Sequence, residues 1–194
     1  MALRFATAGT DVEAAFREGL GRSQSRRERA GALGGAAPDQ FFKTPLPVYA
    51  CSLDALLQEG SGCARQSGWR YLLARDRSVV ETADVVDDGK GGAPPVFRGA
   101  TRGGTVIPKL DQALHAIEGY ASGAGQFELR ILQIPALYIV ALWLSDEGGG
   151  EDLFVDVTNL PLRVQKSGDF WGATLVSAQQ ALVTESALKL DSDK

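Results

Sequence analysis

The order of apolar and polar residues predicts a chain of short strands and a few helices joined by turns. Runs of β-branched and aromatic residues, continuous or alternating with polar ones, indicate strands, whereas apolar residues spaced three and four apart indicate helices. Two long helices are expected, at 105–120 and 170–188. Five strands are expected, at 69–75, 78–86, 127–134, 136–144 and 153–157. Strands that follow one another through short turns favour an α+β fold, with a mainly antiparallel sheet on which both helices pack.

The first 50 residues differ from the rest in pattern and in charge. They hold seven Lys and Arg against five Asp and Glu, whereas residues 51–194 hold thirteen against nineteen. A capped apolar pattern predicts a short helix from Thr10 to about Leu20, and the glycine- and serine-rich stretch 21–37 predicts a linker. Two prolines make residues 41–49 extended. We therefore expect a partly helical N-terminal arm over 1–50 and a single α+β domain over 51–194.

The rare residue types limit the chemistry that this chain can perform. It contains one histidine, His115, and two cysteines, Cys51 and Cys63, which is fewer than the four ligands of a structural zinc site. His115 falls inside a predicted helix, and no nucleophile-elbow motif accompanies any serine, so we expect a surface histidine rather than a catalytic one. We expect no metal site and no cofactor. The sequence does not decide whether the protein is an enzyme, but the lack of a recognisable catalytic motif argues against enzymatic activity.

Composition and targeting signals further limit the kind of protein and its cellular location. Hydrophobic residues make up 44% and charged residues 23%, with a net charge of −4, which is ordinary for a soluble globular protein and unlike a nucleic-acid-coating one. The longest apolar run, 136–144, is too short to span a membrane. The arginine pair in the stretch 25–37 is either part of a twin-arginine export signal or part of a basic linker, and its neighbours favour the linker. We therefore expect a cytoplasmic protein with two reduced thiols, while the pairing of Cys51 and Cys63 stays open.

A glycine-rich loop is expected at 87–104, and it leads directly into the helix at 105–120. Arg98, Arg102 and Thr105 could hold a phosphate or a carboxylate there, because backbone amides at a helix start and guanidinium groups both bind anions. The alternative is a surface loop whose arginines are only solvated.

Carboxylates and aromatic residues on the predicted strands are interpreted as structural. We expect the carboxylates to face solvent, where they discourage pairing between sheet edges. We expect the aromatic residues to pack in the core. The carboxylates are Glu81, Asp84, Glu128 and Asp156. The aromatic residues are Trp69, Tyr71, Tyr138 and Trp143.

The N-terminal arm holds the candidate partner-binding residues. They are Phe41, Phe42 and Tyr49, which flank the prolines, and the basic Arg26 and Arg27. Aromatic residues on an extended segment can anchor in a groove of a partner.

Three hypotheses about function follow from these patterns. The first is a non-catalytic interaction or assembly module of a bacterial-type complex, bound to another protein or to a second copy. The second is a small-molecule-binding or enzymatic domain with a pocket on the concave face of the sheet. The third is an anion-responsive regulator that uses the segment from Arg98 to Thr105.

Overall fold

One mixed sheet organises the chain in the computed structural model, which describes residues 2–29, 42–87, 92–120, 126–158 and 162–192. Its order is β5-β4-β3-β2-β6-β7-β8-β9, and β1 also pairs with β6. The nine strands are β1 (Ala2–Arg4), β2 (Phe42–Ala50), β3 (Arg65–Arg75), β4 (Ser78–Val86), β5 (Val96–Arg102), β6 (Gln126–Ile134), β7 (Ile139–Asp146), β8 (Leu153–Asp156) and β9 (Val164–Lys166). Among the described strands, only the β1–β6 and β2–β6 pairs are parallel. The α+β fold with a mostly antiparallel sheet is confirmed, but the sheet has nine strands within the described residues rather than five.

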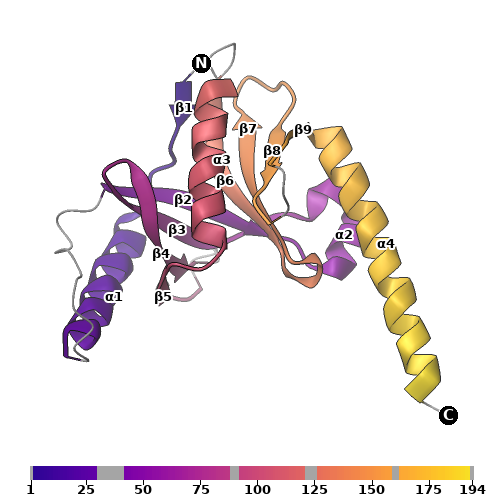
Figure 1. The fold of residues 1–194 in the computed structure, drawn as a ribbon, viewed down its shortest axis with the longest axis horizontal. Helices are drawn as coiled ribbons and strands as arrows, with labels where there is room; N and C mark the ends of the chain where they lie inside the picture. Colours follow the sequence, from indigo (N-terminus) through magenta and orange to yellow (C-terminus); the bar gives the residue numbers. More distant parts are fainter. Residues whose placement is uncertain (1, 30–41, 88–91, 121–125, 159–161, 193–194) are drawn as a thin grey trace.

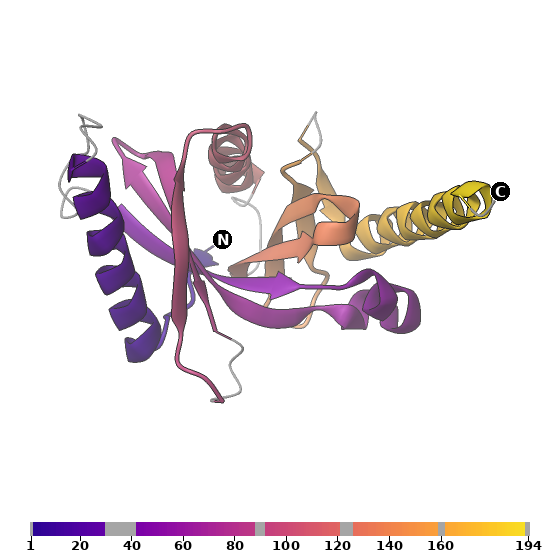
Figure 2. The same ribbon diagram turned by 90° about the horizontal axis from the view of Figure 1, so that it is seen from below.

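Four helices surround this sheet within the described ranges. They are α1 (Thr10–Arg29), α2 (Leu53–Glu59), α3 (Val106–Tyr120) and α4 (Ser167–Ser192), with two short 3-10 turns, η2 (Gly60–Cys63) and η3 (Pro135–Leu137). Figure 1 shows α3 across the middle of the sheet, α1 at one end, and α2 with α4 at the other. In Figure 2, α1 and α3 lie on opposite faces of the same half of the sheet. The far end of α4 extends away from the rest of the molecule.

The strand β2 was expected to be an extended part of an arm, but it lies in the middle of the sheet. Along residues 42–47, where both prolines stand, β2 pairs only with β3, and its parallel pairing with β6 begins at Val48. Pro45 and Pro47 have no N–H to donate, so they are tolerated where the strand has one neighbour. Residues 42–50 therefore belong to the folded body together with β1 and α1.

The helix α1 is longer than the sequence pattern predicts. Its apolar residues stop at Leu20, where we expected a linker to begin, yet the helix continues to Arg29. Phe16 and Leu20 are buried against β3 and β4, in a cluster with Tyr71 and Leu73. The remaining part of the predicted linker, residues 30–37, lies outside the described residues.

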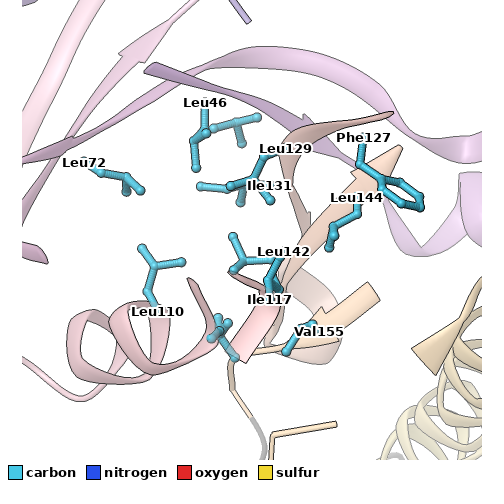
Figure 3. Packing of buried hydrophobic residues seen from close by; sticks show 13 residues of the cluster. Leu46, Leu72, Leu110, Ile117, Phe127, Leu129, Ile131, Leu142, Leu144 and Val155 are labelled. Atoms are coloured by element: carbon cyan, nitrogen blue, oxygen red, sulfur yellow. The ribbon is translucent and has the colours of Figure 1, made fainter. Parts of the chain in front are cut away.

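The concave side of the sheet is filled by α3. Leu110, Ala113 and Ile117 of this helix are buried against leucine, isoleucine and valine side chains from both halves of the sheet. Figure 3 shows Leu110 and Ile117 pointing into this cluster. The hydrophobic periodicity that predicted a helix at 105–120 is thus the packing face of α3.

Two further elements differ from the expectation. Most of the second half of the predicted loop at 87–104 is the strand β5, which is missed because its alternation includes arginine, glycine and alanine. The segment 136–144 was expected to be one strand, but η3 occupies its start. Tyr138 ends this turn with a left-handed backbone, at φ 55°, and β7 follows.

The two cysteines form a disulfide, so the expectation of reduced thiols is wrong for this structure. Cys51 and Cys63 are joined across a separation of 12 residues, with their Cα atoms 5.3 Å apart. Both are buried in a cluster with Phe170 and Trp171, where α2 and η2 meet α4. Sequence separation alone could not show that α2 and η2 fold back on each other.

Among the helices of the described residues, none combines the length and the apolar character that a membrane span requires.

Candidate functional site

A groove of about 630 Å³ opens between α1 and β5. One face of α1 forms the first wall, and the segment from Pro95 to Gly99 forms the second. Positions 15, 19, 22 and 26 share this helix face because side chains three and four residues apart are neighbours on a helix. Four arginines line the groove: Arg22, Arg26, Arg27 and Arg98. We call this feature the arginine groove.

The two walls approach each other at Gly19. A β-carbon at this position would overlap the ring of Phe97, so a larger residue would push α1 away from β5. Phe97 is partly buried in the cluster beneath α1, and Val96 beside it is 55% exposed. The arginine groove therefore has apolar surface at its base as well as cationic side chains on its walls.

A buried carboxylate holds one of the four arginines in place. Glu81 on β4 is fully buried, with its carboxylate 2.6 Å from Arg27 and 3.1 Å from Arg102. Arg27 also donates a hydrogen bond of 3.1 Å to the carbonyl oxygen of Ala100. A carboxylate removed from water needs such charged partners. The C-terminal part of α1 is thereby tied to β4 and β5.

The burial of Glu81 corrects the expectation that it faces solvent. The period of two in β4 places its side chain on the same face as Ala83 and Val85, which is the face that α1 covers. The sequence pattern ended α1 near Leu20 and so gave no sign that Arg27 would reach this strand.

The other arginines of the groove are more available to a ligand. Arg22 pairs with Glu18 at 3.3 Å, but both side chains are about two thirds exposed, with values of 66% and 69%. Arg26 and Arg98 are exposed, and within the described part of the chain no acidic side chain pairs with either of them. Within the described residues, the arginine groove thus offers two arginines, Arg26 and Arg98, that form no ion pair with an acidic side chain.

The structure distributes the predicted anion-binding residues over three places. Arg98 lines the arginine groove, Arg102 is bound to Glu81, and Thr105 is exposed in the turn before α3. Two residues of the predicted partner-binding set, Arg26 and Arg27, line the same groove as Arg98. Residues from two separate sequence hypotheses therefore meet at one site.

The aromatic members of the partner-binding set lie elsewhere. The Tyr49 ring packs edge-on against Trp143, with ring centroids 5.0 Å apart, and the Arg130 guanidinium lies over both rings. Phe42 is the first residue of β2. Phe41 lies outside the described residues.

Three of the strand carboxylates have close partners on the sheet. Asp84 binds Arg70 at 2.6 Å, and Glu128 binds Arg130 at 2.7 Å. Asp156 accepts a hydrogen bond of 2.7 Å from the backbone N–H of Thr158. These contacts give the three carboxylates structural roles.

Of the four aromatic residues expected in the core, Trp69 and Tyr71 are buried and Trp143 is half-buried. Tyr138 is 86% exposed, which corrects the expectation for that residue. His115 is exposed on α3, with its Nδ1 2.8 Å from the backbone oxygen of Asp111.

Tyr71 occupies an unusual position beneath α1. Its ring stacks on Phe16 with centroids 3.8 Å apart, and its buried hydroxyl has no hydrogen-bond partner among the described residues. Burial, with a smaller effect of the nearby Glu13 carboxylate, raises the pKa of Tyr71 to about 12. The indole N–H of Trp69, in the same cluster, is also buried without a partner in this part of the chain.

The described residues contain no group of three or more His, Cys, Asp or Glu side chains that could hold a metal ion. Comparison of the chain with protein-family models, curated proteins and solved structures returned no significant match. The function is therefore argued from the geometry of the arginine groove.

Proposed function

We propose that the protein is a non-catalytic interaction module that binds an acidic segment of a partner protein in the arginine groove. The observation that carries this proposal is the convergence of four arginines on one groove, where Arg26 and Arg98 lack acidic partners within the described residues. Guanidinium groups bind carboxylates through paired, charge-assisted hydrogen bonds, which favours acidic ligands.

The mixture of surfaces favours a polypeptide over a small inorganic anion. Single exposed ion pairs contribute about 0–1 kcal/mol each, so a few arginines alone give weak binding. The exposed Val96 and the half-buried Phe97 add apolar surface beside those charges. A segment with both acidic and apolar side chains can use both kinds of contact, whereas phosphate can use only one.

The rigid setting of the groove supports the same proposal. The ion pairs of Glu81 and the contact between Gly19 and Phe97 fix α1 relative to β5. A preformed groove loses less conformational freedom when it binds, which increases the affinity available from a given set of contacts.

The proposal is tested with a fluorescein-labelled twelve-residue peptide in which glutamate alternates with valine or threonine. The charge-reversal variant R26E/R98E should bind this peptide at least tenfold more weakly in fluorescence anisotropy, a loss of about 1.4 kcal/mol. Binding to the unmodified protein should also weaken as salt rises, because salt screens exposed charges.

The control is R163E, which reverses the charge of an exposed arginine just before β9, at the other end of the sheet. It changes the net charge by the same two units as each single variant, R26E or R98E, which are therefore measured beside it. Its affinity for the peptide should equal that of the unmodified protein. Equal weakening in R163E and in the single variants R26E and R98E would show that only net charge matters and would overturn the proposal. Tighter binding of a single-stranded oligonucleotide of equal charge would assign the groove to nucleic acid instead.

A further inference from the structure

The edge of the sheet lies directly beside the arginine groove. Among the described strands, β5 stands at the end of the order and pairs only with β4. Its outer edge therefore presents backbone N–H and C=O groups that no described strand pairs. Such an edge is a template for an added strand. Figure 2 shows β5 with α1 alongside it.

We propose that the acidic segment binds as an additional strand along β5, with alternate side chains directed into the arginine groove. This inference rests on the proposed function and specifies its mode of binding. Backbone hydrogen bonds to β5 would supply affinity that is independent of sequence, and the groove would supply selectivity for acidic side chains.

The spacing of the arginines along α1 fits the spacing of side chains along an added strand. Side chains on one face of a strand recur every two residues, at about 6.6–6.8 Å. Arg22 and Arg26 are four residues apart on α1, which corresponds to about 6 Å along the helix axis. Acidic residues at alternate positions of the bound segment can therefore meet successive arginines of α1.

The charge of the edge argues against a second copy of this chain as the added strand. Two β5 strands paired with each other would bring Arg98 and Arg102 of both copies, and the arginines of both α1 helices, into one region. Like charges across a strand pair are destabilising. The same arginines that attract an acidic segment thus oppose self-pairing at this edge.

The pairing of β4 with β5 is irregular at Arg98, one of the arginines that line the groove. The register shifts between Asp84 and Val85, so Gly99 pairs with Asp84 and Phe97 with Val85, and Arg98 is the extra residue between them. A bulge of this kind re-aims a side chain and increases the local twist. Arg98 lines the groove next to Phe97, and it also lines a smaller pocket of about 150 Å³ together with Arg70 and Asp84.

The test compares three forms of the glutamate-alternating peptide: unmodified, N-methylated at every glutamate, and N-methylated instead at every valine or threonine between the glutamates. In a strand, the N–H groups of alternate residues point to the same edge, so only one of the two methylated peptides keeps its donors toward β5. One methylated peptide should bind at least tenfold more weakly than the unmodified peptide, and the other should retain most of its affinity. Hydrogen exchange of residues 96–102 should slow when the unmodified peptide binds.

The outcomes separate the failure of this inference from failure of the proposed function. If both methylated peptides bind like the unmodified one while R26E/R98E still weakens binding, the groove binds acidic segments but not as strands, and the inference is overturned. If R26E/R98E binds the unmodified peptide as well as R163E does, the proposed function itself fails. Faster or unchanged exchange of residues 96–102 on binding would also contradict strand addition.

Discussion

At the scale of single residues, Glu81 decides which arginines of the groove are available. Its buried carboxylate forms ion pairs with Arg27 and Arg102, so the charges of these two arginines are balanced within the fold. Arg26 and Arg98 are exposed and line the same groove, and they are the two arginines proposed to bind a ligand. Two arginines near this edge thus form ion pairs with a buried carboxylate, whereas Arg26 and Arg98 belong to the proposed binding site.

Tyr71 leads to a prediction about stability at alkaline pH. In the unfolded chain a tyrosine loses its proton near pH 10, whereas the folded protein keeps the proton of Tyr71 to about pH 12. The stability that the neutral phenol contributes is therefore complete below pH 10 and is lost as the pH rises to about 12. The loss is roughly 2–3 kcal/mol, and urea unfolding between pH 8 and pH 11.5 measures it.

The variant Tyr71→Phe should remove this pH dependence while keeping the ring that stacks on Phe16. At neutral pH it should be as stable as the unmodified protein, or more stable by up to about 1 kcal/mol, because the deleted hydroxyl is buried without a partner among the described residues. The exposed Tyr138 offers the control, since Tyr138→Phe should leave the alkaline loss intact. An unchanged alkaline loss in Tyr71→Phe would contradict this assignment.

At the scale of elements, the contact between α1 and β5 creates the groove. The helix has two glycines in its middle, and they differ in their surroundings: Gly19 lies against Phe97, whereas nothing lies within 4 Å of a β-carbon placed at Gly21. This difference offers a matched pair of substitutions within one helix.

We expect Gly19→Ala to destabilise the protein by about 1–3 kcal/mol, because the added methyl forces α1 and Phe97 apart. Gly21→Ala should instead stabilise it by about 0.5–1 kcal/mol, since alanine favours a helix and has room here. Chemical denaturation measures both free energies. Opposite signs are the expected result, and equal effects of the two substitutions would show that Gly19 is not a packing requirement.

At the scale of the whole molecule, helices cover the two ends of the sheet on the side away from α3, and a disulfide holds one of them. The Cys51–Cys63 bond closes the short segment between β2 and β3 that contains α2 and η2, and it contributes to the cluster under α4. Disulfides persist in oxidising surroundings, whereas the cytoplasmic location inferred from the sequence implies reduced thiols.

The double variant C51A/C63A should lose about 3 kcal/mol of stability, the value expected when the crosslink of a loop of this length is removed. A reducing agent should destabilise the unmodified protein by a similar amount and leave the variant unaffected. Alkylation of the source cells at lysis, followed by mass spectrometry, tests the cellular state. Two alkylated cysteines would contradict a native disulfide, and none would contradict the cytoplasmic prediction.

The sequence by itself determined the elements whose signals are local. The strand at 78–86 matches β4, and the helices at 105–120 and 170–188 correspond to α3 and α4 with boundaries shifted by a few residues. Each of these has a periodic apolar face that is visible within its own span, and such a face needs no knowledge of its partner to be recognised. Three of the four arginines that line the groove, Arg26, Arg27 and Arg98, are also candidates from the sequence, although as members of two unrelated predicted sites, whereas Arg22 is not.

Tertiary structure alone decided the placement of elements whose signals are weak or conflicting. The prolines of β2 argue against a central strand until its one-sided pairing over residues 42–47 is known. The polar end of α1 is helical where Arg27 reaches Glu81, a carboxylate 54 residues away in sequence. The groove exists because β5 and α1 meet at Gly19. A single ion pair or a close approach at one glycine leaves no periodic pattern in either segment, so only the folded chain reveals these contacts.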